Sequence, residues 1–531
     1  MDFIPILLIF IPIFFGVIIY LFHKRNINKF IFLSQSIISI LFLYYINYFF
    51  DSNRVLKHTF GNWVQGIGIT IKVDNLSIYF IALTIFLWWI IILFSWFKRK
   101  YEFKYLFFIL ILEGAFIALL ISDDLFNIFI LLEIISITTT ILIIYKRDGF
   151  AVKSGLFYLL FNSIAMMFFL ISLILLYSIT GTLNIEMIAL KIDNFNDTNI
   201  IIFSYIFMII SLAIKSGVFP AFVWLARANG AAPSSISALL SGIIEAGGIY
   251  IYIQLLSIYN MNLFDNIILT IGVFTSLSAG IMAICHKDIK QILALSTISQ
   301  IGLIFIGLSN ITEYMYIGAL AHIFNHAIFK TLLFLVAGII INRYNSRDIT
   351  KIRGVFKESP IVSIFFIIGL LSISGAPFFS GFITKTIMEY GASSRLILKT
   401  IIKIINFITL LYSIKLIQIF FGTSKVNKLN MKLSNISIFI LVFILILIGI
   451  LGVNIIENIF RVDLNDIEFF TLNNVIYYLI SFLLGGAFYK LFLKDDNKIF
   501  RKIRNYNLSF ENTNTISLVT VVFMIIWVWV F

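Results

Sequence analysis

The chain has 531 residues, of which 61% are hydrophobic and only 12% charged, and its mean hydropathy is +1.04. Soluble globular domains carry about twice that share of charged residues, roughly 25%. This composition excludes a soluble enzyme or binding domain and predicts an all-α polytopic membrane protein.

Apolar stretches recur along the chain at the length that crosses a bilayer as a helix, about 17 to 25 residues. The first has no basic segment before it and no small-residue cleavage site, so we expect a retained helix rather than a signal peptide. We expect about 14 to 16 transmembrane helices, near residues 3–22, 30–50, 75–97, 105–122, 124–145, 155–178, 200–225, 233–257, 262–285, 290–309, 314–341, 360–390, 397–421, 435–456, 471–493 and 513–531.

Most of the 39 Lys and Arg residues fall in alternate loops, among them the loop that holds Lys287 and Lys290 and the longer loops 343–357 and 494–504. Cytoplasmic loops retain basic residues, so the pattern predicts a protein of the cell membrane with both termini outside the cytoplasm. The net charge of +13 is thereby explained by topology. Nucleic acid is not expected as a partner.

The chain contains one cysteine, Cys285. A single cysteine excludes disulfides within the chain and every Cys-rich iron–sulfur or zinc pattern. We therefore expect no cofactor and no metal centre in this chain, and any redox chemistry must belong to a partner.

Two charged residues interrupt apolar runs in the first half of the chain. Glu133 lies in LFNIFILLEIISITTTILI, and Lys215 lies in IIFSYIFMIISLAIKSGVFP. A charge at the centre of a membrane helix costs about 2.5 to 3.5 kcal/mol on insertion scales, so it is seldom kept without a partner or a task. The two could form a pair that switches the proton affinity of the lysine as the carboxylate moves. The alternative is a static salt bridge that fixes helix packing.

Two spans contain glycine and proline at their centres. Pro220 removes the helix hydrogen bond of the Ser216 carbonyl, and Pro377 does the same to Ile373, with glycines beside both. Interrupted helices at corresponding places in two halves of a chain are where transporters put ion sites, which suggests an internal repeat. The alternative is a pair of ordinary proline kinks.

His322, His326 and Lys330 are spaced by four residues, so they form one stripe along a helix. Two imidazoles and a lysine inside a membrane are typical of a proton relay, because histidine exchanges protons near neutral pH. Packing or hydrogen-bonding histidines are the alternative; a metal site is disfavoured because Lys330 would repel a cation. Lys385 is a further deep lysine, and Glu245 is placed for a role between the lysines.

Taken together, several blocks of the chain resemble the antiporter-like subunits shared by respiratory complex I, Mrp-type sodium/proton antiporters and energy-converting membrane hydrogenases. The resemblance runs from about Val73 to Lys415 and rests on the order of its blocks. They are VDNLSIYF, DLFNIFILLE, YSITGTLNI, KSGVFPAFVWLARANGAAPSSISALLSG, KDIKQILALSTISQIG, HIFNHAIFKTLLFLVAG and GAPFFSGFITK.

The resemblance implies two inverted five-helix repeats, expected at residues 105–257 and 262–421, between N-terminal helices in 1–104 and C-terminal helices in 434–531. It implies that Glu133 and Lys215 form the switchable pair. The polar axis would continue through Lys330, His322, His326 and Lys385 towards the outlet. The implied partners are other membrane subunits, the lipid bilayer and peripheral redox subunits that carry iron–sulfur or nickel–iron centres.

The chain departs from the family pattern after the first helix break, where Phe222 and Asn229 stand at two positions that usually hold histidine. Ala246 stands where a lysine is often found, with Glu245 beside it. Two function classes follow: an ion-translocating subunit, with the proton favoured over Na⁺, or a non-conducting scaffold of such a complex. The retained buried charges favour translocation, since a scaffold has no need of several buried charges.

Overall fold

The computed structural model describes residues 3–22, 27–52, 55–64, 66, 68–96, 102–192, 198–259, 265–309, 311–423 and 435–493. In this part of the chain, thirteen helices are long and apolar enough to cross a membrane. Two shorter apolar helices, Asn199–Lys215 and Pro360–Ser374, are the first segments of the two interrupted spans. The prediction of an all-α polytopic membrane fold is confirmed, and the predicted span near 513–531 lies outside the described residues.

The N-terminal region consists of three long helices and a small hairpin. These are α1 (Ile4–Leu21), α2 (Ile27–Ser52), β1 (Leu56–Thr59), the 3₁₀ turn η1 (Phe60–Asn62), β2 (Thr70–Val73) and α3 (Asn75–Ser95). The strands pair antiparallel with Leu56 opposite Val73. Asp74 caps α3 because its carboxylate accepts from the Ser77 amide at 2.9 Å while Ser77 bonds back to the Asp74 amide.

The next helices correspond to the first predicted repeat. They are α4 (Phe103–Ile121), α5 (Leu125–Ile144), α6 (Gly149–Thr180), α7 (Ile185–Ile192), α8 (Thr198–Lys215), α9 (Val223–Ala231), α10 (Ser234–Leu239), the π-helical turn η2 (Leu240–Ile244) and α11 (Glu245–Leu255). The last three form one continuous helical path whose residues are buried except for Ser234 and Gln254, which are partly exposed.

The remaining helices correspond to the second predicted repeat and the C-terminal region. They are α12 (Asp265–Cys285), α13 (Ile289–Leu308), α14 (Glu313–Tyr344), α15 (Val355–Glu358), α16 (Pro360–Ser374), α17 (Ser380–Gly391), α18 (Leu396–Ile417), η4 (Gln418–Phe420), α19 (Asn435–Phe460), α20 (Leu472–Phe488) and the π-helical turn η5 (Tyr489–Leu493).

Both glycine-proline stretches interrupt their helices in the same way. After α8, Gly217 takes φ 69° and the Val218 amide donates to the Ala213 carbonyl at 2.8 Å. After α16, Gly375 takes φ 75° and the Ala376 amide donates to the Leu371 carbonyl at 3.0 Å. Left-handed glycine followed by a bond five residues back is a common helix C-terminal motif. Both helices therefore end inside the bundle, and α9 and α17 begin only after a non-helical stretch.

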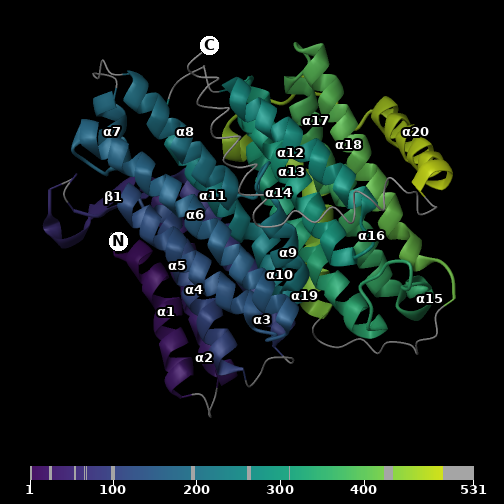
Figure 1. The fold of residues 1–531 in the computed structure, drawn as a ribbon, viewed down its shortest axis with the longest axis horizontal. Helices are drawn as coiled ribbons and strands as arrows, with labels where there is room; N and C mark the ends of the chain where they lie inside the picture. The colour runs from purple at the N-terminus through teal and green to yellow at the C-terminus, as the bar shows by residue number, and fades with distance from the viewer. Residues whose placement is uncertain are drawn as a thin grey trace.

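A second local arrangement also occurs twice, at the start of α5 and at the start of α13. The Leu125 amide donates to the Leu183 carbonyl at 2.9 Å, and the Asp123 carbonyl accepts from Ile185, the first residue of α7, at 3.1 Å. Ile289 and Lys287 exchange two bonds of 2.9 Å with the segment before α15. Figure 1 shows α7 and α15 towards opposite ends of the bundle. An inverted repeat predicts this arrangement.

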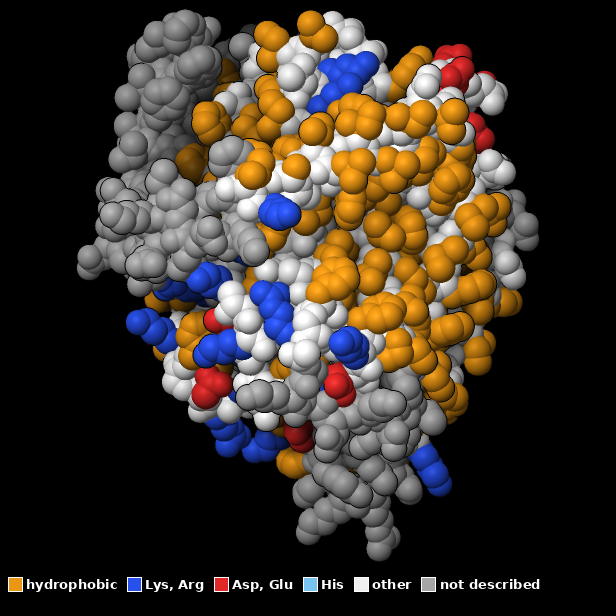
Figure 2. Space-filling model, turned by 90° about the vertical axis from the view of Figure 1, so that its right-hand side faces the viewer, with side chains coloured by type: hydrophobic (Ala, Val, Ile, Leu, Met, Phe, Trp, Pro, Cys, Tyr) orange, Lys and Arg blue, Asp and Glu red, His pale blue; other side chains and the backbone are white. Residues whose placement is uncertain are grey.

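The inner helices of the bundle are α10, α11, α13 and α14, whose residues are almost entirely buried. The exterior is apolar: Figure 2 shows a broad band of hydrophobic side chains, with Lys and Arg gathered mostly towards its lower end, where α15 lies. A hydrophobic band between charged ends is the surface expected of a membrane-embedded bundle. Polar residues on the inner helices are thus removed from both lipid and solvent.

Candidate functional site

Lys215 is the last residue of α8, at the first helix break, and its side chain reaches α5. Its Nζ donates to the Leu132 carbonyl at 3.0 Å and to the Ser136 hydroxyl. The side chain is only 6% exposed. The lysine is therefore solvated by protein oxygen atoms inside the bundle.

Glu133 lies on the same turn of α5, beside Leu132, and its side chain is partly exposed. Both residues are described by the structure, and no ion pair of 4 Å or less joins them, although their charges interact electrostatically. The structure thus places Glu133 and Lys215 on neighbouring helices without direct contact. The predicted switch between them stays a prediction.

Glu245 is the first residue of α11 and follows the π-helical turn η2, a feature often found at functional sites. Asn229 Nδ2 donates to Glu245 Oε1 at 3.3 Å. Glu245 Oε2 and Asn229 Oδ1 are buried and have no hydrogen-bond partner among the described residues. These two oxygens can accept from water or contact a cation.

A glycine brings this part of the chain close to α14. A Cβ at Gly242 would lie 2.6 Å from Thr331 Oγ1, so only glycine allows the present approach. Thr331 is adjacent to Lys330, and the charges of Glu245 and Lys330 interact electrostatically. Lys330 Nζ donates to the Leu293 carbonyl at 3.0 Å and to Ser296 Oγ at 2.5 Å.

The two histidines of α14 differ in their surroundings. His322 bonds Thr384 Oγ1 at 2.8 Å through Nδ1 and Gln300 Oε1 at 3.1 Å through Nε2. His326 packs edge-on against Phe329, with ring centroids 5.4 Å apart, and its Nε2 has no hydrogen-bond partner among the described residues. His322 therefore connects three helices, α13, α14 and α17.

Lys385 follows Thr384 on α17 and lies beside the second helix break. Its Nζ donates to the Ile373 carbonyl at 2.7 Å. The end of a helix leaves main-chain carbonyls without amide partners and carries partial negative charge. The break in α16 therefore provides an oxygen that holds this buried lysine.

The structure brings the predicted residues into two groups. Glu133 and Lys215 form the first, and Glu245, Lys330, His326, His322 and Lys385 form the second. Between the groups α11 packs directly on the end of α8, where a Cβ at Gly248 would lie 2.5 Å from Ser216 Oγ. The hydroxyls of Ser136, Ser296 and Thr384 were not identified from the sequence. Only Ser136 carries a local signal, because it lies one helical turn from Glu133; Ser296 and Thr384 are brought to their partners by helices distant in sequence.

Lys290 corrects one sequence-based assignment, because it is not a loop residue. Asp288 caps α13, which places Lys290 in its first turn with 2% exposure. Lys290 Nζ donates to the Ala232 carbonyl at 2.7 Å and to Ser237 Oγ at 3.2 Å, and Ser237 donates to the Asn229 carbonyl at 2.9 Å. A chain of polar contacts thus leads from the α15 end of the bundle to Asn229, the partner of Glu245.

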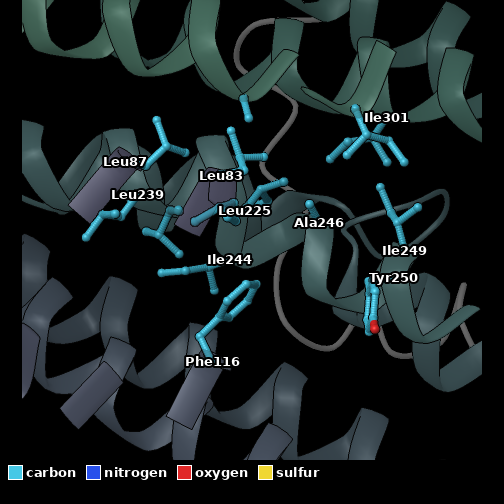
Figure 3. Packing of buried hydrophobic residues seen from close by; sticks show 14 of the residues in the cluster. Leu83, Leu87, Phe116, Leu225, Leu239, Ile244, Ala246, Ile249, Tyr250 and Ile301 are labelled. Carbon is cyan, nitrogen blue, oxygen red and sulfur yellow. The ribbon is translucent and has the colours of Figure 1, made fainter. Parts of the chain in front are cut away.

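Ala246, beside Glu245, is buried and belongs to the hydrophobic core. Figure 3 shows it among other buried hydrophobic residues, which include Leu225, Ile244 and Ile249. No group of three or more His, Cys, Asp or Glu side chains that could hold a metal occurs in the described ranges. Glu113, another membrane-depth carboxylate, accepts a hydrogen bond from Gln35 Nε2 at 2.6 Å on α2.

Comparison with protein families and sequences gives a consistent result. The family model described as NADH:quinone oxidoreductase/Mrp antiporter, TM, matches residues 122–409. The chain is 28% identical over 443 residues to a Na(+)/H(+) antiporter subunit of Alkalihalophilus pseudofirmus, covering 80% of this chain and 88% of that protein. It is 26% identical over 429 residues to a putative antiporter subunit, mnhD2, of Staphylococcus aureus, covering 78% and 85%.

Two solved structures share the fold. A chain of the archaeal membrane-bound sulfane sulfur reductase superposes with a TM-score of 0.81 at 24% identity, covering 86% of this chain and 96% of that one. A chain of the Mrp complex from Dietzia sp. DQ12-45-1b superposes with a TM-score of 0.76 at 20% identity, covering 95% and 99%. The arrangement of helices is thus that of subunits found in large membrane complexes.

Proposed function

Because the chain belongs to the NADH:quinone oxidoreductase/Mrp antiporter family of transmembrane proteins, we propose that it is an ion-translocating subunit of a multi-subunit membrane complex, with the proton as its ion. Lys215, Lys330 and Lys385 would carry the proton through the bundle. Glu133, Glu245, His322 and His326 would exchange it with them.

One observation carries this proposal: the buried lysines are held by neutral oxygens. Lys215 and Lys330 each bond one main-chain carbonyl and one serine hydroxyl, and Lys385 bonds a carbonyl. Within the described residues, none of the three forms an ion pair with a carboxylate. Each serine hydroxyl accepts from the ammonium while it donates its one hydrogen to a main-chain carbonyl, Leu132 for Ser136 and Leu293 for Ser296. Rotation of the hydroxyl away from that carbonyl would let it donate to a neutral amine, so a serine can bond the lysine in both protonation states. A static scaffold built on salt bridges would pair each lysine with an acid.

The absence of an ion pair between Glu133 and Lys215 also supports the proposal that Glu133 switches the proton affinity of Lys215. When the carboxylate approaches, its charge favours the ammonium form of the lysine, and when it withdraws, the low-polarity surroundings favour the neutral amine. The described arrangement, in which Lys215 bonds Ser136 and forms no ion pair with Glu133, would correspond to the withdrawn state. Movement of one side chain would then load or release a proton.

Glu245 would perform the role of the lysine that family members often carry at the position of Ala246. Its carboxylate faces Asn229 and interacts with the charge of Lys330. The polar route from Lys290 through Ser237 to Asn229 would connect it with the α15 end of the bundle. The axis would thus continue through a carboxylate, so the alanine does not argue for a scaffold.

Na⁺ is the second candidate ion, and a specific observation favours it. Glu245 Oε2 and Asn229 Oδ1 are buried oxygens without hydrogen-bond partners among the described residues, and hard cations prefer carboxylate and amide oxygens. The relative from Alkalihalophilus pseudofirmus is named a Na(+)/H(+) antiporter subunit. Against this, the hydrogen bond between His322 and Thr384 can pass a proton, and Gln300 bonds the other ring nitrogen of His322, so these residues offer Na⁺ no open site.

The parent complex would contain other membrane subunits, as the names of the relatives state for those proteins. A peripheral subunit with iron–sulfur or nickel–iron centres would supply the driving force in a dehydrogenase or hydrogenase. In an antiporter, a counter-ion gradient would replace it. Cys285 alone cannot hold a redox cluster, so the chain would transmit energy from elsewhere.

Ion uptake by the purified parent complex in sealed vesicles tests the proposal. Lys215→Ala and Glu133→Gln should each reduce uptake at least tenfold while a native gel shows an intact complex. Glu113→Gln, which removes a buried carboxylate that bonds Gln35, is the matched control and should retain uptake. Unchanged uptake in Lys215→Ala would establish the scaffold instead, and uptake of ²²Na⁺ without pH change would favour Na⁺.

A further inference from the structure

A cavity of about 430 Å³ lies between α17, α18 and α20, beside the break that ends α16. The polar and charged side chains that line it include Lys385, Glu389, Lys403, Asn406, Tyr477 and Tyr478. Lys385 is the last residue of the polar path that we propose carries the proton, so this path ends at the cavity. Glu389, Lys403 and Asn406 have no place in the axis as described so far.

Glu389 follows Lys385 by one helical turn, so both side chains lie on the same face of α17. Asn406 Nδ2 on α18 donates to Glu389 Oε1 at 2.6 Å, which fixes the carboxylate beside the cavity. The charges of Glu389 and Lys385 interact electrostatically without a direct ion pair in the described structure. A carboxylate and a lysine thus face one space from neighbouring turns.

The position of the cavity along the bundle follows from the course of the chain. α16 starts next to α15 and runs away from it, and α17 continues in the same direction to Gly391. The cavity extends from the break, where Ser374 and Gly375 line it, along α17 to Glu389 and along the first half of α18. It therefore belongs to the half of the bundle on the α7 side, opposite the α15 end from which Lys290 leads to Glu245 (Figure 1).

The outer wall of the cavity is α20, which Figure 1 shows at the edge of the bundle beside α18. Only Gly485 of α20 is buried. Two contacts hold its first turns in place: Tyr478 shares a hydrogen bond of 2.8 Å with Ser374, and the Lys403 ammonium lies 5.2 Å from the Tyr477 ring centroid. The helix therefore separates a charged cavity from the lipid on its other face.

We propose that this cavity is the port through which the translocated proton passes between Lys385 and the solvent on the α7 side. Glu389 exchanges the proton with Lys385, and α20 is the wall that keeps lipid out. The Lys385 ammonium gives a proton to the Glu389 carboxylate and becomes a neutral amine; the resulting carboxylic acid then releases the proton to water. The inference rests on the proposed translocation function and names its terminal group.

The lining favours a port over a lipid headgroup site. A phosphate would meet the Glu389 carboxylate as well as the two lysines, and like charges repel at this range. A water-filled passage accommodates both signs of charge. A bound phospholipid is therefore one of the outcomes that the experiment separates.

Cysteine labelling measures whether the cavity holds water. In the assembled complex with Cys285→Ala, Ser481→Cys places a thiol in the cavity wall, and Leu483→Cys places one on the lipid-exposed face of the same helix. A charged, membrane-impermeant thiol reagent needs an ionised thiol, and hence water. We expect Ser481→Cys to react at least tenfold faster than Leu483→Cys. Equal rates, or protection of Ser481→Cys by a co-purifying phospholipid, would overturn the port.

Transport measurements then test Glu389. Glu389→Gln should reduce uptake at least tenfold with an intact complex and unchanged Ser481→Cys labelling, and Glu389→Asp should restore part of it. Glu113→Gln again serves as the control. If Lys215→Ala abolishes uptake but Glu389→Gln does not, translocation stands and the role of Glu389 is refuted. If Lys215→Ala retains uptake, both the proposed translocation function and the proposed port are refuted.

Discussion

At Lys215, a serine hydroxyl occupies the place where a carboxylate was expected. Ser136 is buried, and besides contacting the lysine it bonds the Leu132 carbonyl at 2.6 Å. Leaving a buried donor short of one partner costs about 1 to 3 kcal/mol, and more when the donor is charged. The Ser136 hydroxyl therefore helps to determine the balance between the ammonium and the neutral amine form of Lys215.

We predict that Ser136→Ala lowers ion uptake by about three- to tenfold, because about 1 kcal/mol of stabilisation of the ammonium corresponds to this range. Ser136→Thr should retain most of the activity. The matched control is Thr140→Val, one turn along α5, whose hydroxyl bonds a main-chain carbonyl instead of a lysine. Uptake by vesicles containing equal amounts of assembled complex is the measurement; equal rates for Ser136→Ala and Thr140→Val would contradict the assignment.

Asp123, in the short link between α4 and α5, predicts a dependence of stability on pH. Its Oδ2 accepts from Asn184 Nδ2 at 2.8 Å. Burial raises the pKa of Asp123 from 3.8 to about 6, against the opposing effects of Asn184 and Lys72. The folded protein thus binds more protons than the unfolded chain between about pH 4 and 6, and stability falls as the pH rises through this window.

The expected loss is at most about 3 kcal/mol, at about 1.4 kcal/mol for each unit of pKa. Asp123→Asn removes the titrating group, so the melting temperature of this variant should vary less between pH 4 and 7 than that of the unaltered protein. Thermal unfolding in detergent over this range is the measurement. Parallel curves for the two proteins would show that another group is responsible.

Among the helix pairs, α12 and α13 approach so closely that their backbones touch. A Cβ at Gly302 would lie 2.5 Å from the Ser276 amide nitrogen and 2.7 Å from the Gly272 carbonyl oxygen. Small residues allow this kind of close packing between membrane helices. Since α13 carries both Lys290 and Gln300, its close packing against α12 positions these two polar side chains at two depths of the bundle.

We predict that Gly302→Ala lowers stability by about 1 to 3 kcal/mol, because main-chain atoms cannot move aside as a side chain can. Gly486→Ala on α20 is the control, since nothing lies within 4 Å of an added Cβ there. That variant should be neutral or more stable, because alanine favours the helix over glycine by about 0.5 to 1 kcal/mol. Melting temperatures of the two variants give the comparison, and similar losses would refute the close contact.

The elements that the sequence predicted well are those fixed by local composition. Apolar stretches gave the long helices, and Gly217 and Gly375 marked the two interruptions. The β1–β2 hairpin and the π-helical turn before Glu245 were not predicted, because short strands and an inserted residue leave no clear period in the sequence.

The candidate site was only partly predictable for a related reason. The sequence identified which charges lie at membrane depth, and the structure shows what each one contacts. Lys290 was assigned to a loop since basic residues at span ends are normally exposed, yet the Ala232 carbonyl, which follows α9, and the Ser237 hydroxyl hold its ammonium inside the bundle. Such partners come from helices distant in sequence, and a periodic pattern does not reveal them.

For the molecule as a whole, the uneven distribution of basic residues predicts its orientation. The α15 end should face the cytoplasm, and the α7 end the opposite side. With Cys285→Ala as background, Lys351→Cys near α15 should react with an impermeant thiol reagent only from the cytoplasmic side. Lys191→Cys on α7 should react only from the other side. Reversed labelling in right-side-out vesicles would refute the predicted topology and the direction assigned to the port.

The weak attachment of α20 has a consequence for how a single helix can be released from the bundle. A helix with a single buried residue adds little to the packing of the other helices, and in a bilayer a detached helix remains a stable unit. Replacing Tyr477 and Tyr478, whose side chains contact α18 and the end of α16, with alanine should therefore leave the other described helices folded while opening the Lys385 cavity to lipid. Assembly and activity would then separate at one helix, which would shield the proton path and contribute little to the stability of the fold.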